Sequence, residues 1–354
     1  LFALALALLL AVSLPVSALA RDWYIDNGDI TISATESGQT VSQGDTTEED
    51  DAPVIKQRNS ETTTDSTITI DAEENTTANV TLNGVNIDVS DHADDTTAGI
   101  QTTGNGNVTI ELDGENSVKS AGYAAGLQKE NGGKLTIKDD NTTAGKLEAT
   151  GGTYAAGIGR GNGDNKSVAN ITITGGEIIA KGGYGAAGLG CGASFGSQNS
   201  TSDILISGGK VTATGGKFGA GIGGGSWSSA SDITITGGEV TAKGGPNGAG
   251  IGGGWNGSGG NLSVSISGDA QVKVQGGNSG NYAGTGAGIG NGGIGGSVSP
   301  ANGDEVAPDT SRLTENGKLE YYAPGADMDT AAPTKVIENK PEPKPEPEPS
   351  GDHA

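Results

Sequence analysis

The stretch GGPNGAGIGGG at residues 244–254 has the spacing of a phosphate-binding loop. Three glycines in it satisfy G-x-G-x-x-G: Gly248, Gly250 and Gly253. In a nucleotide enzyme such a loop follows a buried strand and opens a helix, whose N–H groups hold the pyrophosphate. Here a turn and another strand pattern follow, and the same spacing recurs within residues 218–225. A repeated structural unit therefore explains these glycines better than a nucleotide site does.

Few other residues have types and positions suited to catalysis. The two histidines, His92 and His353, are far apart in the sequence, which argues against a histidine triad or metal cluster. The single cysteine, Cys191, has no histidine beside it and excludes an internal disulfide. We interpret it as an unpaired, inert thiol.

Oxygen-bearing residues make calcium the one metal worth considering. Asn162 and Asp164 lie together in the loop GNGDNKS, and hard oxygen ligands suit Ca²⁺. A second acidic loop, DHADD, spans residues 91–95. No aspartate recurs at the place that a calcium-binding nonapeptide repeat would require. We therefore expect no obligatory cofactor, with calcium at Asn162 and Asp164 as the alternative.

The elements that position these residues come from an internal repeat. One sequence unit occurs three times, at residues 171–192, 204–225 and 233–254. Weaker copies begin at Asn79, Asn107, Lys134 and Leu262. Each unit holds three short alternating segments between glycine turns, without helical periodicity. The sequence predicts an all-β, single-stranded, right-handed parallel β-helix of about seven coils of three short strands, with an N-terminal cap.

Alternation assigns the inward side chains of each coil. In the first strand Ile204 and Ile206 face the core, and in the second Val211 and Ala213 do. The third strand reads Ala-Gly-Ile or Ala-Gly-Leu in every unit, which places its glycine outside.

Gly221 and Gly250 represent these outward glycines of the third strand. Glycine weakens a strand by roughly 0.5–1 kcal/mol relative to alanine, so its repeated use requires a reason. Close approach of a ligand is one such reason. We expect the glycines to form a flat, open floor.

Aromatic residues flank the third strand on both sides in sequence. Those before it are Tyr123, Tyr154, Tyr184 and Phe218, and those after it are Trp227 and Trp255. A glycine floor between aromatic rims predicts a groove in which the rings stack on the apolar faces of sugars. One alternative is an aromatic stack that only stiffens the corners. Another is a self-associating stalk in which residues 313–325 or a second copy of the chain cover the strip.

The charge and the two ends of the chain limit its partners and its location. A net charge of −23 argues against nucleic acid and against anionic membranes. An apolar run ending in Ala18-Leu19-Ala20 predicts a secretory signal peptide, and hence a secreted, cell-wall-associated protein. The expected organisation is a signal peptide at 1–20, an acidic cap with the first strands at 21–78, β-helix repeats at 79–299, a C-terminal cap or irregular segment at 300–332, and a Pro/Glu/Lys-rich linker at 333–354.

The NITITGG…AGIGGG units, over about residues 79–296, resemble the repeats of Gram-positive surface proteins with carbohydrate-binding β-helices. The architecture also resembles the β-helix superfamily of pectate lyases and polygalacturonases. The first resemblance implies polysaccharide binding or adhesion to a host or neighbouring cell. A lyase would need clustered aspartates and an arginine base, but Arg160, followed by Asp164, is the only arginine in the coils. We expect a non-catalytic binding protein, with the structural stalk and the lyase as alternatives.

Overall fold

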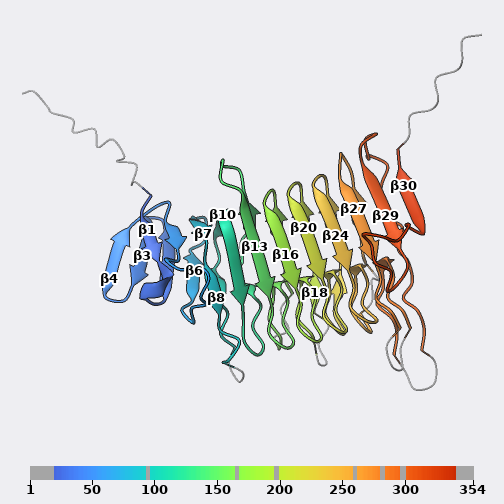
Figure 1. Ribbon diagram of the computed structural model, residues 1–354, viewed down its shortest axis with the longest axis horizontal. Coiled ribbons are helices and arrows are strands. Elements are labelled where there is room, and N and C mark those ends of the chain that lie inside the picture. The colour runs from blue at the N-terminus through green and yellow to red at the C-terminus, as the bar shows by residue number, and fades with distance from the viewer. Residues whose placement is uncertain are drawn as a thin grey trace, which may run out of the picture.

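The computed structural model describes residues 20–92, 96–163, 167–194, 199–257, 261–279, 284–295 and 300–339. Within these residues the chain forms 30 strands and one short 3-10 helix, η1 (Ile25–Asn27). The strands wind into an elongated stack of about eight parallel coils (Figure 1). The predicted parallel β-helix is thereby confirmed.

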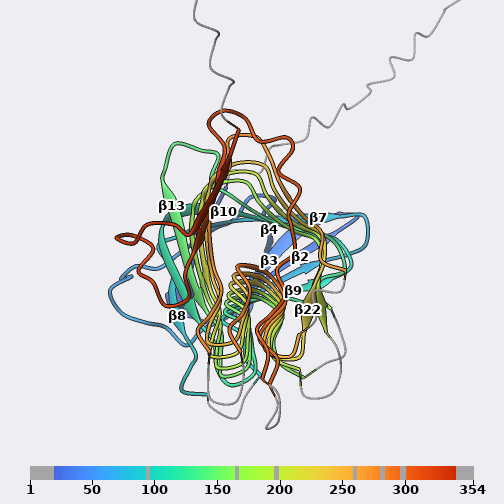
Figure 2. The same ribbon diagram turned by 90° about the vertical axis from the view of Figure 1, so that its right-hand side faces the viewer.

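Three parallel sheets run along the stack, and Figure 2 shows them from its C-terminal end. The first sheet contains β1 (Asp22–Tyr24), β5 (Val54–Lys56), β7 (Thr77–Asn83), part of β10 (Asn107–Lys119), β12 (Leu135–Lys138), β15 (Ile171–Ile173), β19 (Ile204–Ile206), β23 (Ile233–Ile235) and β26 (Val264–Ile266). The second contains β8 (Asn86–Asp88), the rest of β10, β13 (Gly145–Thr150), β16 (Glu177–Lys181), β20 (Lys210–Thr214), β24 (Glu239–Lys243), β27 (Gln271–Gln275) and β29 (Lys318–Tyr322).

The third sheet has much shorter strands in its later coils. It contains β2 (Ile30–Thr35), β6 (Ile68–Ala72), β9 (Ile100–Gly104), β11 (Leu127–Lys129), β14 (Ile158–Gly159), β17 (Leu189–Gly190), β21 (Ile222–Gly223), β25 (Ile251–Gly252) and β28 (Ile289–Gly290). The seven repeats expected from the sequence run from β7 to β28. A further coil, containing β5 and β6, precedes them within the segment expected to hold the cap and first strands.

Equivalent residues of successive coils pair directly, so like side chains form columns through the core. Ile204 is in register with Ile171 on one side and Ile233 on the other. In the second sheet Val211 is in register with Val240. All of these side chains are buried, which confirms the inward positions given by alternation in the first two strands.

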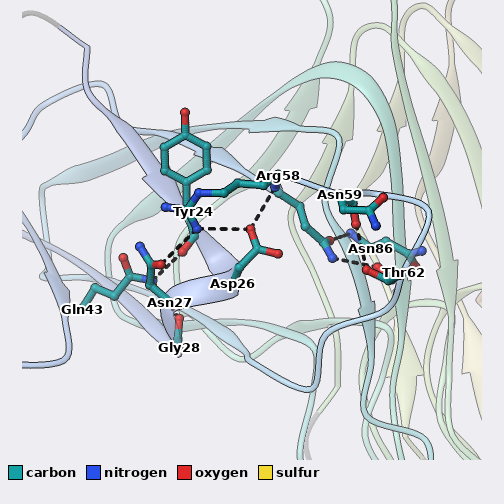
Figure 3. A network of polar contacts seen from close by, with 10 residues as sticks. Tyr24, Asp26, Asn27, Gly28, Gln43, Arg58, Asn59, Thr62 and Asn86 are labelled. Carbon is teal, nitrogen blue, oxygen red and sulfur yellow. Dashed lines mark hydrogen bonds and ion pairs between the residues drawn. The ribbon is translucent and has the colours of Figure 1, made fainter.

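The N-terminal end of the stack is covered by antiparallel strands. The third-sheet strand β2 pairs with β3 (Gly38–Gln43), which pairs with β4 (Thr46–Glu49). Polar contacts join the first coils (Figure 3): the Arg58 guanidinium lies 4.2 Å from the centre of the Tyr24 ring, and the Arg58 N–H donates to Asp26 at 2.8 Å. Strand β3 occupies an edge of β2 that could otherwise pair with another chain.

Strands β29 and β30 (Lys335–Glu338) cover the C-terminal end of the second sheet. Strand β29 continues the sheet in parallel, and β30 pairs with it antiparallel (Figure 1). The Glu305 carboxylate accepts hydrogen bonds from the N–H groups of Gly288 at 2.7 Å and Ile289 at 3.2 Å, at the end of the third sheet. Burial, aided by the nearby Glu305 charge, raises the pKa of Tyr321 to about 12.

The two ends of the chain bear on the remaining sequence predictions. Strand β30 lies within the segment predicted as a linker, so that prediction is wrong for these four residues, which pair with β29. Residues 340–354 of the expected linker lie outside the described residues, as do residues 1–19 of the expected signal peptide. Across the described part of the chain, no helix has the length and apolarity needed to cross a membrane.

Candidate functional site: an aromatic row beside the third sheet

The loop that carries the third-sheet strand turns back on itself in the later coils. Across β21 the Ala220 N–H donates to the Gly224 carbonyl at 2.9 Å, and equivalent bonds span β17 and β25. The chain therefore enters and leaves this short strand close to the same place. The turn before the strand in one coil meets the turn after the strand in the next, where the Trp255 N–H donates to the Phe218 carbonyl at 2.8 Å.

Six aromatic side chains gather where these turns meet. We call them the aromatic row, in the order Tyr123, Tyr154, Tyr184, Phe218, Trp255 and Trp227. Neighbouring ring centroids in that order lie 6.0, 5.9, 5.3, 5.1 and 5.7 Å apart. All six side chains named from the sequence thus come together, but the expectation of two opposite rims is wrong. The folded-back loop places both sets of aromatics at one corner of the coils.

Half of the aromatic row is open to solvent. Tyr123, Tyr184 and Trp227 are 43%, 45% and 47% exposed, and the other three rings are half-buried between them. Trp227 has a φ of 62°, in the left-handed region that bulky residues seldom adopt. The backbone N–H of Trp227 donates to the backbone carbonyl of Trp255 at 2.7 Å, so the turn holds the Trp227 indole in an exposed position.

The expected open glycine floor is absent from the described coils. Gly221 and Gly250 are buried, and a Cβ on Gly221 would lie 2.5 Å from the backbone nitrogen of Lys243. The next glycine, Gly223, lies under a small two-stranded sheet of β18 (Ser200–Thr201) and β22 (Ser229–Ala230). The Thr201 hydroxyl donates to the Gly223 carbonyl at 2.7 Å. The prediction of solvent-facing glycines is wrong, because these glycines allow neighbouring backbones to pack closely.

The residues considered for metal binding and nucleophilic chemistry have structural contacts. The Asn162 amide donates to the Ala193 carbonyl at 3.1 Å, and its partner in the calcium hypothesis, Asp164, lies outside the described residues. The described residues contain no group of three or more His, Cys, Asp or Glu side chains arranged to hold a metal. Cys191 is buried, its thiol donates to the Ser200 carbonyl at 3.2 Å, and burial raises its pKa.

A cluster of charged and amide groups, which no sequence pattern indicated, lies at the Tyr123 end of the aromatic row. The buried Arg160 guanidinium lies 3.7 Å from the Glu130 carboxylate, to which the Gln128 amide donates at 3.2 Å. The sequence suggests a role for Arg160 only as the base of a lyase. Its ion pair with Glu130 gives it a partner that the sequence did not reveal.

Beside this cluster, Lys129 is a buried amine whose titration should be measurable. Lys129 is 4% exposed, and its amine donates to the carbonyls of Asn131 at 2.7 Å and Gly133 at 2.9 Å. Burial, together with the positive charge of Arg160, lowers its pKa to about 8 from 10.5. Between these two values the unfolded chain binds a proton that the native state lacks, so the free energy of unfolding rises with pH.

We expect this rise to reach about 1.5 kcal/mol between pH 8 and pH 9.5 in urea unfolding. The Lys129→Met variant should lose it. Tyrosine ionisation interferes little, because the raised pKa of Tyr321 places its effect at higher pH. Equal pH slopes in the two proteins would contradict the assignment to Lys129.

Comparisons with known proteins agree with the architecture. A family model described as a β-helix repeat matches residues 204–226 and 233–255, which are the coils of β19–β21 and β23–β25. Comparison with curated proteins and with solved structures gives no match. The repeat and the stacked coils together define the class as a parallel β-helix protein.

Proposed function

We propose that this protein is a non-catalytic β-helix, exported to the surface of a Gram-positive bacterium, that binds a polysaccharide chain along the aromatic row. The predicted signal peptide supports export. The β-helix repeat supports the proposal because stacked coils place equivalent side chains in a line along which a long ligand can bind. The binding itself rests on the aromatic row.

The single observation that carries the proposal is the exposure of three rings in one continuous row. Of the five large apolar side chains exposed in the described residues, three belong to the row: Tyr123, Tyr184 and Trp227. Contiguous exposed apolar surface on a soluble domain marks interaction sites. Rigid aromatic faces with a polar edge are suited to the alternating apolar and hydroxyl surfaces of a sugar chain.

The spacing of the row also fits a chain of sugars. Tyr123 and Tyr184 lie two coils apart, which is about 10 Å at the usual distance between strands. That is close to the length of one disaccharide in an extended glycan. Lys217 adds a donor beside the row, with its amine 5.3 Å from the centre of the Tyr184 ring.

A structural stack is the rival account of the same residues, and exposure separates the two roles. The half-buried rings of Tyr154, Phe218 and Trp255 pack between their neighbours, so they stabilise the corner under either account. The exposed rings of Tyr184 and Trp227 have less packing to lose than these three. Alanine at either exposed position therefore distinguishes binding from stiffening.

We expect Tyr184→Ala and Trp227→Ala each to weaken glycan binding about tenfold, since an exposed aromatic contact is worth about 1.4 kcal/mol. Melting temperatures should stay close to wild type. The measurement is affinity electrophoresis through gels containing cellulose derivatives, xylan, mannan or polygalacturonate. The control is Tyr24→Ala, because Tyr24 is an aromatic residue that stacks on Arg58 outside the row. This variant should bind the glycan like wild type.

Retained binding with a lowered melting temperature in both row variants would favour the structural stack instead. Incubation of the bound polysaccharide with the protein tests the absence of catalysis. No new reducing ends or unsaturated products should form, with or without calcium. Unsaturated products from polygalacturonate would indicate a lyase.

A further inference from the structure

The early coils depart from the glycine pattern at one position of the third strand. In the later coils the residue after the buried Ile or Leu is a glycine with positive φ, as at Gly159. In register with Gly159 lies Gln128, and in register with Gln128 lies Gln101. The side chains that the repeat excludes elsewhere are therefore present here in two successive coils.

These departures converge on one pocket of about 290 Å³, which we call the polar pocket. Its lining comprises Thr96, Gln101, Tyr123, Gln128, Glu130, Arg160, Gly161 and Asn162. Tyr123 belongs to both the polar pocket and the aromatic row, so the pocket continues the row at its N-terminal end. Its volume is at the lower limit of small-ligand sites and suits about one sugar ring.

The Glu130 carboxylate is held in place within the polar pocket. The Gln128 amide donates to one oxygen at 3.2 Å and the Gln101 amide to the other at 3.5 Å. The Arg160 guanidinium lies 3.7 Å from the carboxylate, and its side chain is 10% exposed. Gln128 is itself fixed, since its carbonyl oxygen accepts from the Ala125 N–H at 3.0 Å.

This arrangement leaves a fixed acceptor facing solvent. The Glu130 side chain remains 36% exposed, so part of the carboxylate is accessible from the pocket. A carboxylate has about four acceptor sites, more than its protein donors occupy. A preorganised acceptor binds a hydroxyl group without the cost of ordering a side chain.

The charges in the polar pocket select against ionic ligands. Glu130 and Arg160 compensate each other, so a charged ligand would gain little net attraction. An acidic sugar would also place its carboxylate beside that of Glu130, in a protein of net charge −23. A neutral ligand rich in hydroxyl groups avoids both penalties.

We propose that the polar pocket binds one neutral pyranose unit, whose hydroxyls donate to Glu130 and whose ring lies against Tyr123. This inference rests on the proposed function, because the unit belongs to the same glycan that lies along the aromatic row. The pocket thereby selects neutral over acidic polysaccharides and fixes the position of the chain along the coils.

The test is calorimetric titration with hexasaccharides of β-1,4-linked glucose, xylose and mannose, and of α-1,4-linked galacturonic acid. Wild-type protein should bind at least one neutral hexasaccharide. Glu130→Gln should weaken that binding at least tenfold. Glu148→Gln should not, although it removes a carboxylate of matching exposure, 35%, which is paired with a lysine on the second sheet.

A second variant protects the test against a folding defect in Glu130→Gln, which leaves Arg160 without its counter-charge. Thr96→Tyr fills the polar pocket from an exposed rim position and should also weaken binding at least tenfold. Its melting temperature should match that of wild type.

The outcomes separate the two proposals. Unchanged binding in Glu130→Gln and Thr96→Tyr, with loss in Tyr184→Ala, would overturn the polar pocket and leave the aromatic row standing. Binding of the galacturonic acid hexasaccharide, but of no neutral one, would also overturn the polar pocket and leave the aromatic row standing. If wild-type protein binds none of the four hexasaccharides, the proposed pocket is wrong. If wild-type protein is also not retained by any polysaccharide in affinity electrophoresis, the proposed function is wrong.

Discussion

Replacing Gly221 by valine is expected to destabilise the protein by about 3 kcal/mol, the upper end of the usual cost of overpacking. A Cβ at this position would lie 2.5 Å from the Lys243 nitrogen, 2.7 Å from the Gly250 oxygen and 2.9 Å from the Ala213 oxygen. All three atoms are backbone, so no side chain can move aside. The coil spacing must change to accommodate valine, and the columns above and below would lose their register.

The measurement is urea unfolding followed by far-ultraviolet circular dichroism. Gly44→Ala is the matched control, because Gly44 has a φ of 57° and open space around its Cβ position. Only the left-handed backbone opposes alanine there, at a cost of about 1 kcal/mol. Equal stability of Gly221→Val and wild type would contradict the close packing described for the third sheet.

Ending the chain at residue 299 is expected to make the protein self-associate into oligomers and larger aggregates. The truncation removes β29 and β30, which cover β27 and complete the second sheet. The missing segment also carries the buried side chains of Leu319 and Tyr321. A solenoid without its terminal cap exposes both an apolar core and an unpaired strand edge, and such edges pair with other chains.

Size-exclusion chromatography with light scattering measures this effect. A chain ending at residue 339 retains both capping strands and is the control. It should elute like the full-length protein. A soluble, monomeric protein ending at residue 299 would show that the last coil needs no cap.

The fold was predictable because every repeat shows the same alternation of apolar and polar residues along its strands. Ile204 and Ile206 occupy every second position of a strand that recurs with the same spacing, and their burial follows directly. The prediction that the third-strand glycines face solvent is wrong because side chains alternate between two faces only along several extended residues. Strand β21 has two, and the residue at its end, Gly223, has a φ of 132°, which redirects the chain.

The six members of the aromatic row could be identified because each lies four or five residues from the buried Ile or Leu of a third strand, but their arrangement could not be predicted. Position before or after a strand in sequence does not say on which side of it a residue lies when the loop folds back. The repeat does not predict the polar pocket, because the pocket is lined by side chains at positions where the coils differ from one another. The available signal was the departure from the repeat, at Gln101 and Gln128, where later coils have glycine.

The most direct test of glycan binding along the aromatic row is affinity as a function of oligosaccharide length, in a series of the polysaccharide that the protein retains. The row spans four coil steps from Tyr123 to Trp255, about 19 Å, or roughly four sugar units. We predict that affinity rises with each unit up to about that length and then levels off. Affinity that does not depend on chain length would contradict binding along the row.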